Sequence, residues 1–482
     1  MLLIAGINFL HMPAFRIGGD SAAVEYVSVG LINFGNLSVP EDIASTYGDR
    51  GQFYFKNAKN GKWYSKYGIA NTFIFALPRS FEKLLVGDLT YRSKYRILSL
   101  NLFNILLSIF LFLYLSKLFS LYTEHLWLNL VFCFCIFYAT YLSYYLRAQS
   151  AEIYQTLFFT GFFYHSVLYL RALAKSQPSE TRAKATLNLI FALFFLGLSC
   201  LVKIVYILML PGFLFILIKS NGFKATGDVI KALVFITCLL ILISLIHYFK
   251  FGSAIETGYG QWEDEHDFFI MNIPKNFLAS LFHPRNGLLL NFPIIILSVF
   301  GIKSYFKKHG KEVSLLFMTT VPVFILILAF ENWAGEWSYG PRYFLFALPA
   351  LSLPGLFPAT KIFESKKKKV KYALIILIIL CLNFFALINF NANALNFFIA
   401  YEIRDVHLDG VENPLVDQYF DRNHFGFIAH DLIKFRENGA PLSFLGSLEN
   451  SKNEKQIEEL EKRIGKSLSP NYYWFRGGVL IQ

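Results

Sequence analysis

Along the 482-residue sequence, long apolar runs alternate with polar connections. Most runs are roughly 17–25 residues long, the length at which an apolar helix crosses a bilayer. We count about eleven of them, at residues 1–14, 97–115, 126–146, 153–173, 186–202, 204–218, 231–250, 287–306, 313–330, 343–360 and 372–390. This pattern predicts an all-α polytopic membrane protein with about eleven transmembrane helices. The first run is short, and we expect a first transmembrane helix that the assigned start partly truncates.

Three longer polar segments lie between or after these runs, at residues 15–96, 250–286 and 391–482. The first of them opens with a helical pattern, because Val24, Val27, Leu31 and Phe34 fall on one face and Gly35 follows as a stop. We expect such a helix to lie in the membrane interface. The last segment is mixed and polar, which predicts a small C-terminal α+β domain. The predicted organisation is a transmembrane domain at 1–390 and an extracytoplasmic domain at 391–482.

Charge divides the connections into two sets. The connections at 116–125, 171–185, 219–231, 303–312 and 361–371 contain 18 Lys or Arg and 5 Asp or Glu. Those at 147–152, 203, 250–286 and 331–342 contain 6 Lys or Arg and 8 Asp or Glu. Because positive charge marks cytoplasmic loops, the first set is predicted to be cytoplasmic and the longer segments to lie outside.

Composition narrows the functional class. Hydrophobic residues make up 55% of the chain and charged residues only 16%, which argues against a nucleic-acid partner. The net charge of +12 is accounted for by the lysine-rich inner connections, so it indicates topology. The sequence contains no GxGxxG, Walker A, HExxH or GxSxG motif, which argues against ATP-driven transport and against zinc or serine hydrolysis.

Ionisable residues collect at the outer ends of the predicted spans, where they are functional candidates. They are Asp20, Glu25, Arg147, Glu152, Lys203, Arg285, Glu331, Glu336 and Arg342, with Tyr26 beside the second. Carboxylates close to Arg and Lys at the lipid surface suit a phosphate-bearing lipid substrate. The cations would neutralise its phosphate, and a carboxylate would deprotonate an acceptor hydroxyl.

Several of these residues have a simpler structural interpretation. Asp20 is equally suited to cap the following helix, and Arg147 to anchor a helix end at the interface. Trp333 fits an aromatic belt. The acidic run Glu263, Asp264, Glu265, His266 and Asp267 offers oxygen ligands for a divalent metal, although such runs are more often solvated loops. No cofactor is required by any motif.

Five local motifs resemble those of the GT-C superfamily of polytopic glycosyltransferases, which includes protein mannosyltransferases and the aminoarabinose transferases of lipid A. They are residues 19–26 with 35–40, Tyr64-Ser-Lys66-Tyr67-Gly68 with Pro78, Leu198–Lys203 with Pro211, residues 251–259 with 284–293, and Trp333-Ala-Gly335 with Tyr339-Gly-Pro-Arg342-Tyr343. The motifs occur in the superfamily's order and cover residues 1–390. One departure is Ser21, where many members have an acidic residue after the first carboxylate.

This resemblance implies a polyprenyl-phosphate sugar as donor, used outside the cytoplasm with inversion at the anomeric carbon. Carried over, Asp20 is the expected general base, and Lys203, Arg285 and Arg342 are the expected phosphate-binding residues. The expected pocket residues are Glu25, Tyr26, Lys66, Tyr67, Arg147, Glu152, Glu331, Trp333, Glu336 and Tyr339.

The sequence therefore predicts an integral membrane glycosyltransferase, as in a bacterial inner membrane, with its active site on the extracytoplasmic face. Its acceptor would be a glycan, a lipid or a protein. Two alternatives stay open, a flippase or transporter of lipid-linked sugars and a polymerase of surface glycans. The first predicts ionisable residues through the depth of the bilayer, where Lys203 alone qualifies.

Overall fold

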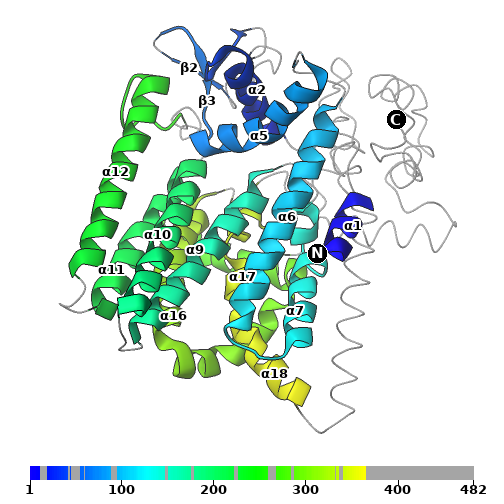
Figure 1. Cartoon of the computed structure of the whole chain (residues 1–482), viewed down its shortest axis with the longest axis vertical. Coiled ribbons are helices and arrows are strands. Elements are labelled where there is room, and N and C mark those ends of the chain that lie inside the picture. The colour runs from blue at the N-terminus through cyan, green and yellow to red at the C-terminus, as the bar shows by residue number, and fades with distance from the viewer. Residues whose placement is uncertain are drawn as a thin grey trace, which may run out of the picture.

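The structure is a computed structural model, which describes residues 1–10, 19–41, 44, 55–58, 60–87, 89, 95–146, 150–174, 179–221, 226–258, 268–283, 287–331, 333–335 and 340–364. The described part is mostly helical, as predicted (Figure 1). The predicted span at 372–390 and the predicted domain at 391–482 lie outside the described residues.

The helical bundle contains most of the elements. They are α1 (Leu2–Leu10), α6 (Arg96–Ser120), α7 (Leu126–Tyr138), α8 (Leu142–Tyr145), α9 (Ala151–Ala174), α10 (Ser179–Val202), the 3-10 helix η2 (Ile204–Leu208), α11 (Met209–Asn221), α12 (Thr226–Phe251), α14 (Asn272–Phe282), α15 (Leu288–Asn291), α16 (Ile295–Ala329), η4 (Arg342–Phe344), α17 (Leu348–Leu351), η5 (Leu353–Gly355) and α18 (Leu356–Glu364).

Five helices are long and apolar enough to cross a membrane. They cover Leu98–Ser120, Ala151–Ala174, Arg182–Val202, Gly227–Phe251 and Ile295–Ala329, and they coincide with predicted runs. Shorter apolar helices cover Ala23–Phe34, Leu126–Tyr138 and Ile204–Ser220. The chain is therefore an integral membrane protein, and the count of about eleven spans stays a prediction.

Helix α16 covers two of the predicted runs. Its 35 residues include a non-helical backbone at His309 (φ −135°, ψ 41°), within the connection predicted at 303–312. Both ends of α16 lie close to η4. Before α16, the Asn291 carbonyl accepts a hydrogen bond from the Tyr141 amide, and the Tyr141 hydroxyl donates to the Pro341 carbonyl next to η4 (3.1 Å). After α16, the Phe330 ring lies 6.4 Å from that of Tyr343 in η4. The chain thus folds back at His309, and the two segments correspond to two predicted spans.

Two other predicted spans are interrupted helices. In 126–146 the helix stops after Tyr138, where the Thr140 hydroxyl bonds the Ile136 carbonyl and the Tyr141 amide donates to Asn291 instead of to the preceding turn. In 343–360 the chain forms four short helices, because Pro349 and Pro354 cannot donate a helical hydrogen bond.

The segment between α1 and α6 forms a separate layer over one end of the bundle (Figure 1). It contains α2 (Gly19–Phe34), β1 (Ser38–Val39), β2 (Phe55–Asn57), β3 (Trp63–Ser65) and α5 (Ile69–Val86). Helix α2 ends before Gly35 (φ +63°), which confirms the helix expected there. Its buried residues Ala23 and Val27 pack with Phe55 in a small core beneath the sheet.

The sheet in this layer was not expected from the sequence. Its strands pair antiparallel in the order β1-β3-β2, with Ser38 opposite Tyr64 and Lys56 also opposite Tyr64. Strands of two or three residues are too short to show an alternating pattern. The one usable signal was Asn60-Gly61, a hairpin dipeptide in which Gly61 adopts φ +74°.

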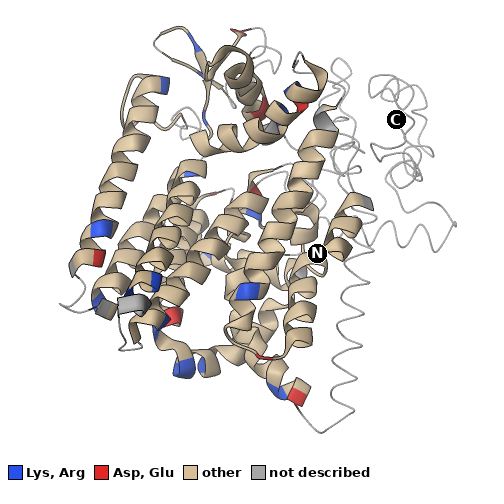
Figure 2. Ribbon diagram, viewed as in Figure 1, with Lys and Arg blue, Asp and Glu red and all other residues tan. Residues whose placement is uncertain are grey.

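The bundle has two distinct ends. We call the end covered by the α2–α5 layer the Lys203 end, and the opposite end the Glu312 end. At the Glu312 end the carboxylate of Glu312 accepts hydrogen bonds from Tyr122 (2.5 Å) and from Arg171 (2.7 Å). These bonds connect the α6–α7 turn and the end of α9 to α16. Lys and Arg gather at this end, in keeping with the charge division in the sequence (Figure 2).

Candidate functional site

The site is built around a break between two apolar helices. Helix α10 ends at Val202, and Lys203 is extended (φ −147°, ψ 119°) before η2 begins. Its amide still donates to the Ser199 carbonyl (3.0 Å), so the chain changes direction without losing that bond. A lysine between two apolar runs needs water or a partner, and the extended residue turns it out of both helices. The Lys203 ammonium lies 4.0 Å from the centroid of the Tyr343 ring.

The turn from β3 into α5 lies directly on this break. A Cβ on Gly68 would lie 2.2 Å from the Leu201 carbonyl oxygen and 2.4 Å from that of Val202, so only glycine fits. The Asn71 side chain donates to the Val202 carbonyl (2.8 Å), and the Tyr154 hydroxyl donates to the Asn71 amide oxygen (2.5 Å). The bond from Asn71 satisfies the Val202 carbonyl, which lies at the end of α10 and has no partner within the helix. The contacts of Gly68 and Asn71 also bring Lys66 next to Lys203.

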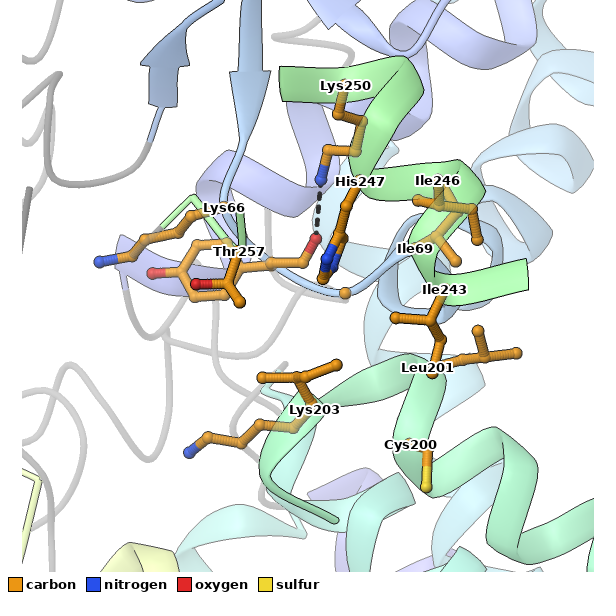
Figure 3. A pocket seen from close by; sticks show the side chains of 13 residues that line it. Lys66, Ile69, Cys200, Leu201, Lys203, Ile243, Ile246, His247, Lys250 and Thr257 are labelled. Atoms are coloured by element: carbon orange, nitrogen blue, oxygen red, sulfur yellow. Dashed lines mark hydrogen bonds between the residues drawn. The ribbon is translucent and has the colours of Figure 1, made fainter. Parts of the chain in front are cut away.

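A hollow opens between this turn, the end of α10 and the last turns of α12. Its volume is about 430 Å³, counting the space open to solvent. The lining includes Lys66, Lys203, Lys250 and His247, and an apolar wall of Ile69, Cys200, Leu201, Ile204, Ile243 and Ile246. Figure 3 shows the Lys66 and Lys203 side chains directed to the same side of the hollow. Among the described residues that line the hollow are three lysines and no carboxylate, so the hollow suits an anion joined to an apolar chain.

The far side of the hollow is fixed by an ion pair. Glu256 lies 3.0 Å from the Lys56 ammonium and accepts a hydrogen bond from the Gly258 amide (3.1 Å). Partial burial acts to raise the pKa of Glu256, but the bonds from Lys56 and Gly258 outweigh it and leave the pKa below its usual value. Gly258 (φ +77°) lies against Lys66, because a Cβ there would be 3.1 Å from the Lys66 Cα.

Arg342 is held by a glycine loop next to Lys203. Its amide donates to the Ala334 carbonyl (3.2 Å), and Gly335 (φ +90°) lies against its side chain. A Cβ on Gly335 would be 2.4 Å from the Arg342 Nε. The guanidinium carbon lies 5.0 Å from the centroid of the Tyr343 ring, so Lys203 and Arg342 share one aromatic neighbour.

Glu152 joins this group from the start of α9. Tyr145 has both the Glu152 carboxylate and the Arg342 guanidinium as charged neighbours. The buried Tyr206 has Glu152 as a charged neighbour as well, and its hydroxyl donates to Gln155 (2.7 Å). The structure therefore brings Lys66, Tyr67, Lys203, Glu152 and Arg342 to one end of the bundle.

The comparisons with known proteins bear on the fold. No protein-family model and no curated protein matches the sequence. Among solved structures, the oligosaccharyltransferase of Archaeoglobus fulgidus in the apo form has a TM-score of 0.52 at 12% identity, with 88% of this chain and 59% of that chain covered. The oligosaccharyltransferase AglB of the same organism, in complex with an inhibitory peptide and a dolichol-phosphate, has a TM-score of 0.51 at 13% identity and the same coverage. This chain thus spans 59% of the length of those transferases.

The chain has the GT-C fold. ArnT from Cupriavidus metallidurans in the apo state is also similar, with a TM-score of 0.49 at 10% identity over 90% of this chain and 68% of that chain. The fold confirms the resemblance predicted from the motifs.

Other predicted site residues lie elsewhere or outside the described part of the chain. Glu25 is buried on α2, 3.7 Å from Arg79 of α5, so it contributes to the contact between these helices. Tyr26 packs against the small core beneath the sheet. Glu331 is exposed at the end of α16, and Trp333 is buried, with its ring 6.3 Å from Phe344.

Asp20 is the second residue of α2, and its side chain is outside the described part. Also outside it are Arg147, Arg285, Glu336, Tyr339 and the acidic run Glu263, Asp264, Glu265, His266 and Asp267. Within the described residues, no group of three or more His, Cys, Asp or Glu side chains is arranged to hold a metal ion.

Two lining residues were missed in the sequence, His247 and Lys250 at the end of α12. Lys250 closes an apolar run, and a lysine in that place is usually an interfacial anchor. The available signal was its position in the chain, because Lys250 belongs to the same predicted outer surface as Lys203. The two residues share a helix face with Ile243 and Ile246, which form part of the apolar wall.

Proposed function

We propose that this protein is a membrane glycosyltransferase that moves a sugar from a polyprenyl-phosphate donor to an acceptor outside the cytoplasm. The observation that carries the proposal is the hollow at the Lys203 end of a GT-C fold. Lys66, Lys203 and Lys250 line it together with an isoleucine-rich wall. A phosphate joined to a prenyl chain combines the two properties that this lining would recognise.

The donor phosphate has several sources of positive potential in this site. Lys66 and Lys203 point to the same side of the hollow, and Arg342 shares the Tyr343 ring with Lys203. Helix α5 begins at Ile69 on the edge of the hollow, where its N-terminal amides favour an anion. AglB, which has the same fold, was solved in complex with a dolichol-phosphate. Arg285 is proposed as a further phosphate-binding residue.

The transfer step follows from a carboxylate base opposite a phosphate leaving group. The Asp20 carboxylate takes the proton of the acceptor as the acceptor oxygen or nitrogen bonds to the anomeric carbon. The bond between that carbon and the phosphate oxygen breaks, and polyprenyl phosphate leaves with the electron pair. Attack opposite the leaving group inverts the anomeric carbon. Lys203 and Arg342 stabilise the charge that grows on the leaving phosphate.

The packing of helix α2, which begins with Gly19 and Asp20, supports this role. Helix α2 packs on α5 and on β3, the two elements that flank Lys66. Lys66, Tyr67, Arg147, Glu152, Glu336 and Tyr339 are proposed as residues around the sugar and acceptor. The sugar is a hexose or a pentose in this proposal, and the acceptor is a glycan, a lipid or a protein.

We further propose that the Lys203 end faces away from the cytoplasm, as in a bacterial inner membrane. The Lys and Arg residues at the Glu312 end support this orientation through the positive-inside rule. Residues 391–482 would then form an extracytoplasmic domain next to the transmembrane domain at 1–390.

The test is an assay of the full chain in proteoliposomes with polyprenyl-phosphate sugars and candidate acceptors. We expect release of free polyprenyl phosphate together with a product of inverted anomeric configuration. Asp20→Asn should lower the rate by about 10²–10⁴-fold, the range for a lost general base. Asp228→Asn is the matched control, because Asp228 is paired with Lys231 (3.1 Å) at the Glu312 end.

The alternatives give different results in the same assay. A flippase would move the lipid-linked sugar across the bilayer without forming product, and a polymerase would lengthen a glycan chain. Full transfer activity in Asp20→Asn would show that Asp20 is not the base.

A further inference from the structure

We propose that Lys250 is a positioning residue that sets the place of Lys66 in the donor site. This inference rests on the proposed function, because it gives Lys66 the role of a phosphate-binding residue. Lys250 comes from α12, a helix far from Lys66 in the sequence, and nothing in the motif that contains Lys66 points to it.

The contact is made through the main chain on both sides of Lys66. The Lys250 ammonium donates one hydrogen bond to the Ser65 carbonyl and another to the Tyr67 carbonyl (3.1 Å). Figure 3 shows the second of these bonds as a dashed line. Two carbonyls separated by one residue are thereby drawn to a single cation, which fixes the direction of the Lys66 side chain between them.

Burial makes this contact costly to lose. Lys250 is 5% exposed, and the Ser65 and Tyr67 carbonyls are its hydrogen-bond acceptors among the described residues. A buried polar group that loses its hydrogen-bond partner costs free energy, because water cannot take the place of that partner. Replacing this ammonium leaves two carbonyls without their donor, so the turn is expected to move.

The same turn is fixed on its other side to Lys203. Gly68 lies on the Leu201 and Val202 carbonyls, and Asn71 donates to Val202. The turn at 65–68 is therefore held by contacts on two sides, with the end of α10 on one side and with Lys250 of α12 on the other. The distance between Lys66 and Lys203 depends on both sets of contacts, so Lys250 also affects the width of the proposed phosphate site.

The role is positioning and not direct catalysis. The ammonium of Lys250 is occupied by carbonyls of the protein, whereas Lys66 and Lys203 point to the same side of the hollow. Lys250 acts on the donor through the turn. Two consequences can be measured separately, a looser turn in the free protein and weaker binding of a polyprenyl phosphate.

Hydrogen–deuterium exchange of the full chain tests the first consequence without any lipid. In Lys250→Met, we expect at least tenfold faster exchange in the peptide that covers residues 63–71. Lys250→Arg, which keeps the charge and the donors, should restore most of the protection. Arg171→Met is the matched control at the Glu312 end, where it removes a cation bonded to Glu312 (2.7 Å) and should leave residues 63–71 unchanged. Unchanged exchange in Lys250→Met would overturn the inference whatever the activity of the protein.

Native mass spectrometry with undecaprenyl phosphate as the probe tests the second consequence. Lys66→Met and Lys250→Met should each weaken binding by about tenfold, the size expected for the loss of a charged hydrogen bond. The double variant should bind no more weakly than Lys66→Met alone, because Lys250 acts through Lys66. Losses that multiply in the double variant would show that Lys250 acts independently and would overturn the inference. A wild-type protein that does not bind undecaprenyl phosphate would instead contradict the proposed function.

Discussion

The ammonium of Lys203 and the guanidinium of Arg342 lie over one aromatic ring, 4.0 Å and 5.0 Å from the centroid of Tyr343. Arg342 also donates to the Tyr343 hydroxyl (3.3 Å). Two cations near one ring repel each other, and a further interaction has to offset that repulsion. The ring does so through its quadrupole and fixes the spacing between a residue from the α10–η2 break and a residue from the loop before α17.

Tyr343 should therefore matter for donor binding although it carries no charge. Tyr343→Leu removes both cation contacts, and we expect the KM for the lipid-linked donor to rise by about tenfold, which corresponds to about 1.4 kcal/mol. Tyr343→Phe keeps the ring and loses only the hydroxyl bond, so its KM should stay within about threefold of the wild type. Initial rates over a range of donor concentrations give both values.

Tyr248→Leu is the control for this comparison, because Tyr248 is 63% exposed on α12. Equal KM values for Tyr343→Leu and the wild type would mean that the ring does not organise the two cations for the donor.

Gly335 should not tolerate a side chain. Its φ of +90° is strained for other residues, and a Cβ would lie 2.4 Å from Arg342 Nε. We expect Gly335→Ala to lower the free energy of unfolding by about 1–3 kcal/mol and to weaken donor binding by displacing Arg342. Thermal unfolding in detergent and donor titration measure the two effects. Gly227→Ala, at an exposed helical site with nothing within 4 Å, should leave both unchanged. A Gly335→Ala protein as stable as this control would refute the steric argument.

The Glu312 end should affect stability without affecting the reaction. Glu312→Gln weakens bonds to Arg171 and Tyr122 that connect α9, the α6–α7 turn and α16. We expect a loss of about 2–3 kcal/mol in the free energy of unfolding, since removing one partner leaves the buried groups poorly compensated. The KM and kcat of the protein that stays folded should equal those of the wild type. A selective loss of kcat would indicate coupling between the two ends of the bundle.

The ion pair of Glu256 and Lys56 predicts a pH dependence on the far side of the hollow. The pKa of Glu256 is lowered in the folded protein, so its contribution to stability is complete above the ordinary value of 4.5 and is lost as the pH falls through the folded-state value. The protection of residues 252–258 against hydrogen exchange, relative to the intrinsic exchange rate at each pH, should therefore fall below about pH 4.5. In Glu256→Gln that pH-dependent loss of protection should be absent. Because the pair is partly exposed, its contribution is at most about 1 kcal/mol.

Much of the membrane domain could be predicted from the sequence, because the length and the apolar character of a run are enough to identify a spanning helix. The long helices α6, α9, α10 and α12 coincide with predicted runs, and the fold back within α16 lies in the predicted connection at 303–312. The interruption at Tyr141 was missed because it depends on a tertiary hydrogen bond from Tyr141 to Asn291, which a run of apolar residues does not reveal. The interruption at Pro354 has a local cause, because Pro349 and Pro354 cannot donate a helical hydrogen bond, and these prolines were the available signal.

The candidate site was readable in part. Lys203 could be predicted because burying a lysine between two apolar runs costs free energy unless the lysine is hydrated or paired. Lys66 and Arg342 could be predicted because they belong to motifs of the resemblance. Lys250 was missed because its role depends on carbonyls of Ser65 and Tyr67, which are distant in the sequence. Backbone acceptors have no sequence signature, so residues that act through them are visible only in the folded chain.

The bend at His309 has a consequence for the polarity of the chain in the membrane. Because α16 returns to the end from which it started, the polypeptide before Leu288 and the polypeptide after Phe330 belong to the same compartment. An enzyme reporter inserted near Lys307 would then report the opposite compartment from one inserted on either side of α16. A count that takes α16 for one unbroken span would reverse the face of the bilayer predicted for every segment that follows it.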